Sequence, residues 1–109
     1  MSGSGGGGYG GGFATDEVAC DRLAFDTQLS SPKAAVVAHI NAGDVLTVAL
    51  DQQGAAQVVV IKRGNDIAGG ITSPKMAHLL ECIRQGTRYQ ATVTAKSDGQ
   101  VSVRISPLR

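Results

Sequence analysis

The chain has 109 residues, of which 42% are hydrophobic and 17% charged, and its net charge is +1. This size and composition predict one globular domain with a single modest core. A net charge so close to zero gives no general indication of nucleic-acid or membrane binding. No apolar run reaches the ~20 residues that a membrane helix requires, and the start of the chain lacks the basic-then-apolar pattern of a signal peptide.

Residues 1–14 are nearly all glycine, with Tyr9 and Phe13 among them. Glycine has no side chain to bury and loses the most entropy on folding, so this tail is predicted to be disordered. Two interpretations stay open: an inert leader or linker, or a flexible arm whose two rings dock on a partner. Residues 15–109 are expected to form the folded domain.

The domain is organised by a repeat. Ser31-Pro32-Lys33 and Ser73-Pro74-Lys75 each precede an apolar helix, and each helix is followed by a glycine, Gly43 or Gly86. Serine is a good helix N-cap and proline suits the first helical position, so helices are expected to begin at these motifs. Glycine suits the left-handed residue that ends a helix.

Apolar residues follow each motif at the spacing of one helix face. The longer stripe is Met76, Leu79, Leu80 and Ile83, and the shorter one is Val36, Val37 and Ile40. The phase of the flanking strands also agrees, which makes a chance match the weaker interpretation. Repeat one (22–63) and repeat two (66–106) are each predicted to run strand, helix, glycine, strand, turn, strand.

Two tight hairpins are expected from the turn residues and from side-chain parity. A two-residue turn at Gly64-Asn65 places Val60 opposite Gly69, with Val58 and Val60 facing the core. A three-residue loop at 97–99 with a bulge places Val93 opposite Val103, and it also sets residue 95 opposite residue 101. The predicted fold is therefore mainly β with two short helices, a small six-stranded pseudo-two-fold β-barrel built from two strand-helix-strand-strand repeats.

The order strand, helix, "NAGDVLTVAL", "AQVVVIKRGNDIAGGI", helix, "QGTRYQATV" is similar to that of a HIRAN-type domain, a six-stranded barrel with two helices. The resemblance covers about residues 23–106 and implies DNA-end binding. The chain departs from that family at 51–56, where "DQQGAA" replaces a stretch that usually contains Asn and Asp. The Gly-Asp turn after the first helix is also similar to the two-fold barrels of the double-psi type.

No catalytic constellation is found, because neither His39 nor His78 lies beside a serine or cysteine nucleophile in a motif. A non-catalytic domain without a cofactor is therefore expected. His78 and Cys82 have i, i+4 spacing and, with Cys20 and His39, could supply four zinc ligands. Cys82 borders the apolar stripe and is expected to pack as a small hydrophobe, so no metal site is predicted. Two cysteines make no disulfide framework, and a reducing, cytoplasmic location is expected.

Acidic and basic residues are unevenly distributed along the chain. The net charge is −4 up to Asp51 and +5 from Gln52 onward. Small barrels bind single strands through a basic groove, so the main functional prediction is single-stranded nucleic acid, DNA in particular, bound by the later half. The residues expected to carry it are Lys62, Arg63, Arg88, Lys96 and Arg104.

The alternative prediction is a protein-interaction or self-assembly module that acts as an accessory subunit. The acidic half of one copy could meet the basic half of the next, which gives a homo-oligomer. Val59 and Ile61, expected on the outer face of the third strand, would supply an apolar contact.

Overall fold

The structure is a computed structural model, and it describes residues 18–108. The glycine-rich tail, with Tyr9 and Phe13, lies outside the described residues. Within them the chain is mainly β, with two α-helices. In chain order the elements are η1 (Cys20–Arg22, a 3₁₀ helix), β1 (Phe25–Gln28), α1 (Ala34–Val37), β2 (Val45–Gln53), β3 (Ala56–Arg63), β4 (Asp66–Gly70), α2 (Met76–Arg84), β5 (Tyr89–Ser97) and β6 (Gln100–Pro107).

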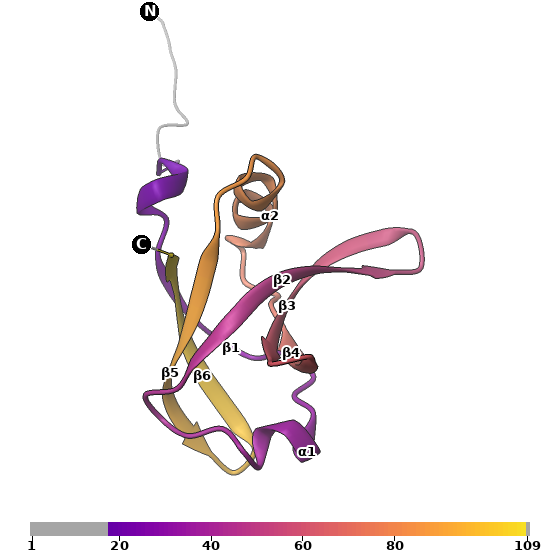
Figure 1. Cartoon of the computed structure of the whole chain (residues 1–109), viewed down its shortest axis with the longest axis vertical. Coiled ribbons are helices and arrows are strands. Elements are labelled where there is room, and N and C mark those ends of the chain that lie inside the picture. The colour runs from indigo at the N-terminus through magenta and orange to yellow at the C-terminus, as the bar shows by residue number, and fades with distance from the viewer. Residues whose placement is uncertain (1–17, 109) are drawn as a thin grey trace, which may run out of the picture.

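The six strands form one antiparallel sheet in the order β1-β6-β5-β2-β3-β4. The sheet curls, with α1 near one end and α2 near the other (Figure 1). Its two outer strands approach each other just after β1, where Ser30 exchanges two backbone hydrogen bonds with Gly70 (2.8 and 2.9 Å). In the described part of the chain this contact is an isolated bridge, so the sheet is not closed.

Both helices begin two residues later than expected. Ser31 has a positive φ of 49°, and the N-cap positions are Lys33 and Lys75, neither with a side-chain cap. The helix does not begin before Lys33, because the Lys33 N–H donates to the Ala68 carbonyl of β4 (2.8 Å) and Lys33 itself is extended. At the second motif the Ser73 hydroxyl accepts the Lys75 N–H (3.1 Å) in a turn that precedes α2.

The apolar stripes are confirmed, and Gly86 follows the end of α2 as predicted. Gly43 is not the residue that ends α1, because this helix ends at Val37 and Gly43 lies in the later turn that leads into β2. The buried core includes Val37 and Ile40 after the first motif and Leu79 after the second, with Val36, Met76, Leu80 and Ile83 packed against it. Gly43 and Gly86 have φ values of 96° and 103°, which L side chains rarely adopt. The repeat therefore predicted correctly which helix faces are buried and where the chain turns back into a strand.

The first hairpin has the expected two-residue turn, with Arg63 opposite Asp66. A register shift between Ile61 and Lys62 then places Val60 opposite Gly70, so the predicted partner, Gly69, is wrong by one residue. A bulge of this kind cannot be read from turn chemistry, because it lies inside the strands.

In the last hairpin Val93 lies opposite Val103, as parity requires. The three-residue loop is wrong, because Ser97 pairs with Gln100 around a two-residue Asp98-Gly99 turn. Both turn residues have positive φ (51° and 82°), as a type I′ hairpin turn requires. The extra residue lies within β5, between residues 93 and 95, and it sets residue 95 opposite residue 102.

The predicted orientation of β3 is wrong. Val59 and Ile61 are fully buried in the core, so neither supplies a surface patch. Their cross-strand partners on β2 are Leu50 and Val48, which are partly buried against the core and share a face with buried Leu46. Directly opposite residues lie on the same face of a sheet, so this stripe of β2 determines which side of β3 faces inward.

Cys20 and Cys82 form a disulfide with each other. The prediction that the two cysteines make no disulfide is therefore wrong. The bond joins η1 to α2 across a sequence separation of 62 residues. Closing a loop of this length stabilises the fold by about 4 kcal/mol in the chain-entropy model. Cys82 is 1% exposed, so it packs in the core as expected while also forming the covalent link.

We predict that Gly43→Ala and Gly86→Ala each lower the free energy of unfolding by about 1–2 kcal/mol, because alanine is strained at positive φ. An added Cβ meets nothing within 4 Å at either position, so the cost is purely conformational. Gly70→Ala is the matched control, since its φ lies outside that region and its Cβ makes an ordinary contact at 3.6 Å. Urea denaturation measures all three, and equal stability of the three variants contradicts this account.

Candidate functional site: the fork between strands β2 and β5

The two repeats meet in the middle of the sheet through a short ladder. β2 and β5 pair at Val45–Thr92, Leu46–Ala91 and Thr47–Gln90. The pairing then ends, although β2 continues to Gln53 beside β3. Figure 1 shows the β2–β3 hairpin extending away from β5 at this point. We call the opening the fork, bounded by residues 45–48 of β2 and 86–90 at the start of β5.

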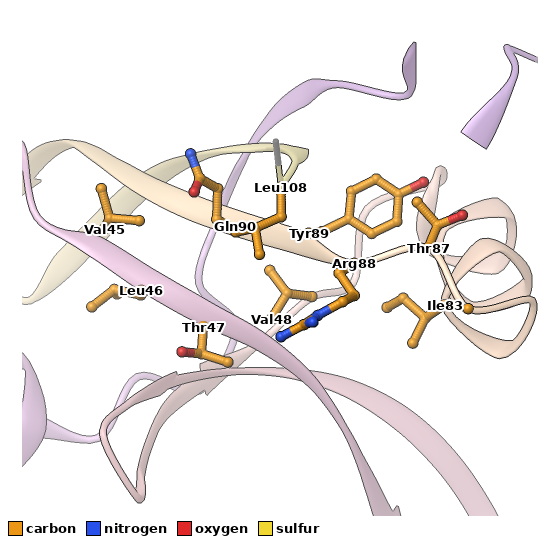
Figure 2. A pocket seen from close by; sticks show the side chains of 11 residues that line it. Val45, Leu46, Thr47, Val48, Ile83, Thr87, Arg88, Tyr89, Gln90 and Leu108 are labelled. Atoms are coloured by element: carbon orange, nitrogen blue, oxygen red, sulfur yellow. The ribbon is translucent and has the colours of Figure 1, made fainter. Parts of the chain in front are cut away.

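A cavity of about 450 Å³ lies in the fork. β2 and β5 supply its two sides, the end of α2 supplies Ile83, and the segment after β6 supplies Leu108 (Figure 2). The lining residues are Val45, Leu46, Thr47, Val48, Ile83, Gly86, Thr87, Arg88, Tyr89, Gln90 and Leu108. The volume falls within the range of sites that bind small molecules or single side chains.

The lining combines exposed apolar side chains with one positive charge. Val45 and Leu108 are 59% and 47% exposed, and with Val18 they are the exposed large hydrophobic residues of the described chain. Arg88 carries the formal charge among the lining residues, and its side chain points back toward β2 on the side of Val48 (Figure 2). Thr47 and Gln90 add hydrogen-bonding groups. Such a cavity suits an apolar group that ends in, or lies beside, a carboxylate or phosphate.

Tyr89 connects the fork to the N-terminal end of the described chain. Its ring is 4% exposed, and its hydroxyl donates to the Cys20 carbonyl at 2.6 Å. Burial, and secondarily the negative charge of Asp21, raise the pKa of Tyr89 above its usual value. The wall of the fork at Tyr89 is therefore joined to η1 by this hydrogen bond, and η1 is joined to α2 by the disulfide.

Two of the five predicted nucleic-acid residues, Lys96 and Arg104, contact neighbouring elements of the domain. Lys96 donates from Nζ to the carbonyls of Val37 and Ile40 (2.9 and 2.8 Å), so it caps the end of α1. Arg104 forms an exposed ion pair with Asp26 at 3.3 Å. Both interactions tie the side chain to a neighbouring element of the chain rather than leaving it to face a ligand.

The other three predicted bases lie on β3 and at the start of β5. Arg63 ends β3 opposite Asp66. Lys62 lies opposite Thr47, and Arg88 lines the cavity with Thr47. Of the predicted residues Arg88 therefore lines the fork, and Lys62 lies one strand away from it, opposite Thr47. Sequence reasoning found Arg88 only as a base and missed the remaining lining residues, because no sequence signal states where a strand ladder ends.

The candidate metal ligands are only partly brought together. Cys20, Cys82 and His78 are neighbours, but both sulfurs are used in the disulfide. His39 lies in the turn after α1. Across residues 18–108 no three His, Cys, Asp or Glu side chains are arranged to hold a metal ion.

Neither helix in residues 18–108 is long and apolar enough to cross a membrane. Comparisons of the chain with protein-family models, curated proteins and solved structures found no match. The resemblance to a HIRAN-type domain therefore stays a prediction, and the functional argument rests on the geometry of the fork.

We predict that Lys96→Met lowers the free energy of unfolding by about 1–2 kcal/mol, because two buried carbonyls at the end of α1 lose a charged donor. Methionine keeps the length of the side chain. Lys75→Met, at an exposed position before α2, is the matched control and should change stability by less than about 0.5 kcal/mol. Equal effects of the two substitutions in urea denaturation would show that Lys96 is an ordinary surface base.

Proposed function

We propose that the chain is a non-catalytic protein-interaction module that binds an extended peptide segment in the fork. The peptide pairs with the edge of β2 beyond Thr47, places an apolar side chain in the cavity and presents an acidic group to Arg88. The observation that carries this proposal is that β2 continues for six residues, 48–53, after its ladder with β5 has ended.

The free edge supports strand addition on general grounds. Alternate N–H and C=O groups of an edge strand point away from its one partner and are a template for another strand. Peptide recognition by strand addition combines such backbone bonds with a pocket for alternate side chains. In this protein the cavity lies at the point where the added strand would begin, and Thr47 belongs to both the ladder and the cavity lining.

The chemistry of the lining supports an acidic partner with an apolar residue beside the acid. Val45, Val48 and Leu108 are apolar, and Arg88 carries the one formal charge among the lining residues. A guanidinium group binds a carboxylate with two parallel hydrogen bonds, which fixes its orientation as well as adding affinity. Lys62, which lies on β3 opposite Thr47 of β2, adds a second positive charge one strand away from the fork.

Single-stranded nucleic acid is the second candidate, because Lys62 and Arg88 both lie next to Thr47. The engagement of Lys96 and Arg104 elsewhere leaves fewer phosphate contacts than the sequence indicated. Self-association through the acidic and basic halves stays a prediction. So does the cytoplasmic location, against which the Cys20–Cys82 disulfide is an argument, since stable disulfides are rare in reducing compartments.

We also propose that the fold is the pseudo-two-fold barrel that the repeat predicts. Exchanging the strands of repeat one with those of repeat two returns the same strand order read from the other edge. Thr47 and Gln90 pair with each other, and they lie four residues after the equivalent glycines Gly43 and Gly86. A residue that pairs antiparallel with its own equivalent lies on a two-fold axis. The Ser30–Gly70 bridge flanks Leu29 and Ile71, which are also equivalent positions, and this supports an axis through both sides of the barrel.

Selection from a displayed library of random heptapeptides tests the proposed function. We expect the enriched peptides to carry β-branched residues at every second position and to contain Asp, Glu or a free C-terminal carboxylate. Arg88→Gln should weaken a selected peptide by about ten-fold or more, since a hydrogen-bonded charge pair contributes about 1.5–3 kcal/mol. Arg63→Gln, a charge removal on β3 outside the cavity lining, is the matched control and should leave affinity nearly unchanged.

Two results contradict the proposal. One is the absence of enriched peptides; the other is enrichment of peptides whose affinity Arg88→Gln does not change. A labelled oligothymidine measured by fluorescence anisotropy at low salt separates the second candidate. Binding that falls with both Lys62→Gln and Arg88→Gln, without peptide enrichment, favours nucleic acid over peptide.

A further inference from the structure

The Cys20–Cys82 disulfide lies at the floor of a surface hollow that is separate from the fork. The hollow measures about 420 Å³, and its lining residues are Cys20, Pro74, Ala77, His78, Glu81, Cys82 and Gln85. Cys20 is half-buried, whereas Cys82 is 1% exposed. An incoming thiolate therefore reaches the Cys20 sulfur first, and the Cys82 sulfur is the leaving group.

A proton donor lies beside this leaving sulfur. His78 Nε2 is 3.9 Å from Cys82 Sγ and 2.8 Å from the Val18 carbonyl oxygen. A carbonyl oxygen only accepts hydrogen bonds, so the contact with Val18 requires the proton to be on Nε2. The nitrogen that carries this N–H also lies within reach of a thiolate that forms on Cys82, and a leaving thiolate that is stabilised departs faster.

We propose that Cys20–Cys82 is a thiol–disulfide exchange site for a dithiol reductant, and that its opening releases η1 from α2 and loosens the wall of the fork. One reductant thiolate attacks Cys20 Sγ, which forms a mixed disulfide and breaks the bond to Cys82. The Cys82 thiolate is stabilised by a hydrogen bond from the Nε2–H of His78 and takes its proton from water. The second thiol of the reductant then attacks the reductant's first sulfur, which is bonded to Cys20 in the mixed disulfide, and Cys20 leaves as a thiolate. Two electrons thus pass to the protein, and the reductant ends as an intramolecular disulfide.

The connection to the fork runs through Tyr89 and the end of α2. The Tyr89 hydroxyl donates to the Cys20 carbonyl, and Ile83, one residue after Cys82, lines the fork cavity with Tyr89. Once the disulfide opens, η1 loses its covalent link to α2 and keeps its contact with β6 and the hydrogen bonds at Val18 and Cys20. This consequence for the fork rests on the proposed function, whereas the exchange reaction does not. A disulfide that opens reversibly is also compatible with a reducing compartment, where disulfides are transient.

The first test treats the native protein with dithiothreitol and counts free thiols without denaturant. We expect two thiols to appear under native conditions. His78→Gln should slow their appearance by about ten-fold or more, because the leaving thiolate loses its donor. His39→Gln, in the turn after α1, is the matched control and should leave the rate unchanged. Glu81→Gln should speed the attack about two-fold, since it removes a negative charge from the path of an anionic thiolate.

The second test reads the release of η1 through Tyr89. In a Tyr9→Phe background Tyr89 is the sole tyrosine and the chain has no tryptophan, so its ionisation is read directly from ultraviolet absorbance. Opening removes both η1 and Asp21 from the hydroxyl, so the pKa of Tyr89 should fall toward the ordinary tyrosine value in the reduced protein and in a Cys20→Ser/Cys82→Ser variant.

Thiols that stay protected until the protein is denatured would overturn the exchange site. So would equal rates for His78→Gln and His39→Gln. An unchanged Tyr89 titration in the reduced protein would overturn the release of η1. Because these measurements use no peptide, they can fail while peptide selection on the fork succeeds, and the reverse also holds.

Discussion

The pairing of β2 with β5 is the constraint on which the rest of the structure depends. It is the central one of three strand pairings that join one repeat to the other, the other two being β1 with β6 and β3 with β4, and it consists of three residue pairs that end at Thr47–Gln90. On one side of this point the two strands share a ladder and bury Leu46 against Ala91. On the other side they diverge and leave the fork. The same short ladder therefore links the two repeats at the centre of the sheet and creates the candidate site.

The divergence has a physical cause in the elements that precede β5. α2 ends at Arg84, and Gly86 turns the chain back with a positive φ. Tyr89 is then held toward the N-terminal segment by its hydrogen bond to Cys20, while the disulfide holds that segment against α2. β2 meanwhile follows β3, with which it pairs to the end of the hairpin. β2 therefore stays paired with β3, whereas the start of β5 is held beside η1, and the ladder between β2 and β5 does not continue.

Much of the fold could be predicted because the same pattern of strands, helix and glycine occurs twice in the sequence. Local patterns in the sequence predicted four features of the fold. These are the buried stripe of α2, the glycines with positive φ, the turn at Gly64-Asn65 and the pairing of Val93 with Val103. The errors come from features that such patterns do not encode. A bulge inside β5 gave the same parity as the expected three-residue loop, and β3 is apolar on both faces, so Val59 and Ile61 were assigned to the wrong side. The pairing of β3 with the Leu46–Val48–Leu50 stripe would have identified the correct face.

The candidate site was harder to predict, since it depends on where chain segments separate in space. Basic residues in the later half of the chain predict Arg88 as a binding residue, but they predict Lys96 equally. Lys96 instead caps α1 through two carbonyls. The Cys20–Cys82 link was also out of reach, because two cysteines far apart in sequence carry no sign of their contact.

Amide hydrogen exchange of the free protein, resolved by residue, tests the central claim most directly. A ladder that ends at Thr47–Gln90 predicts that in residues 48–53 the amides directed toward β3 are protected, whereas the alternate amides directed toward the fork exchange at close to unprotected rates. Uniform protection of both sets through residue 53 would mean that β2 is paired on both sides, and it would remove the free edge and the fork together.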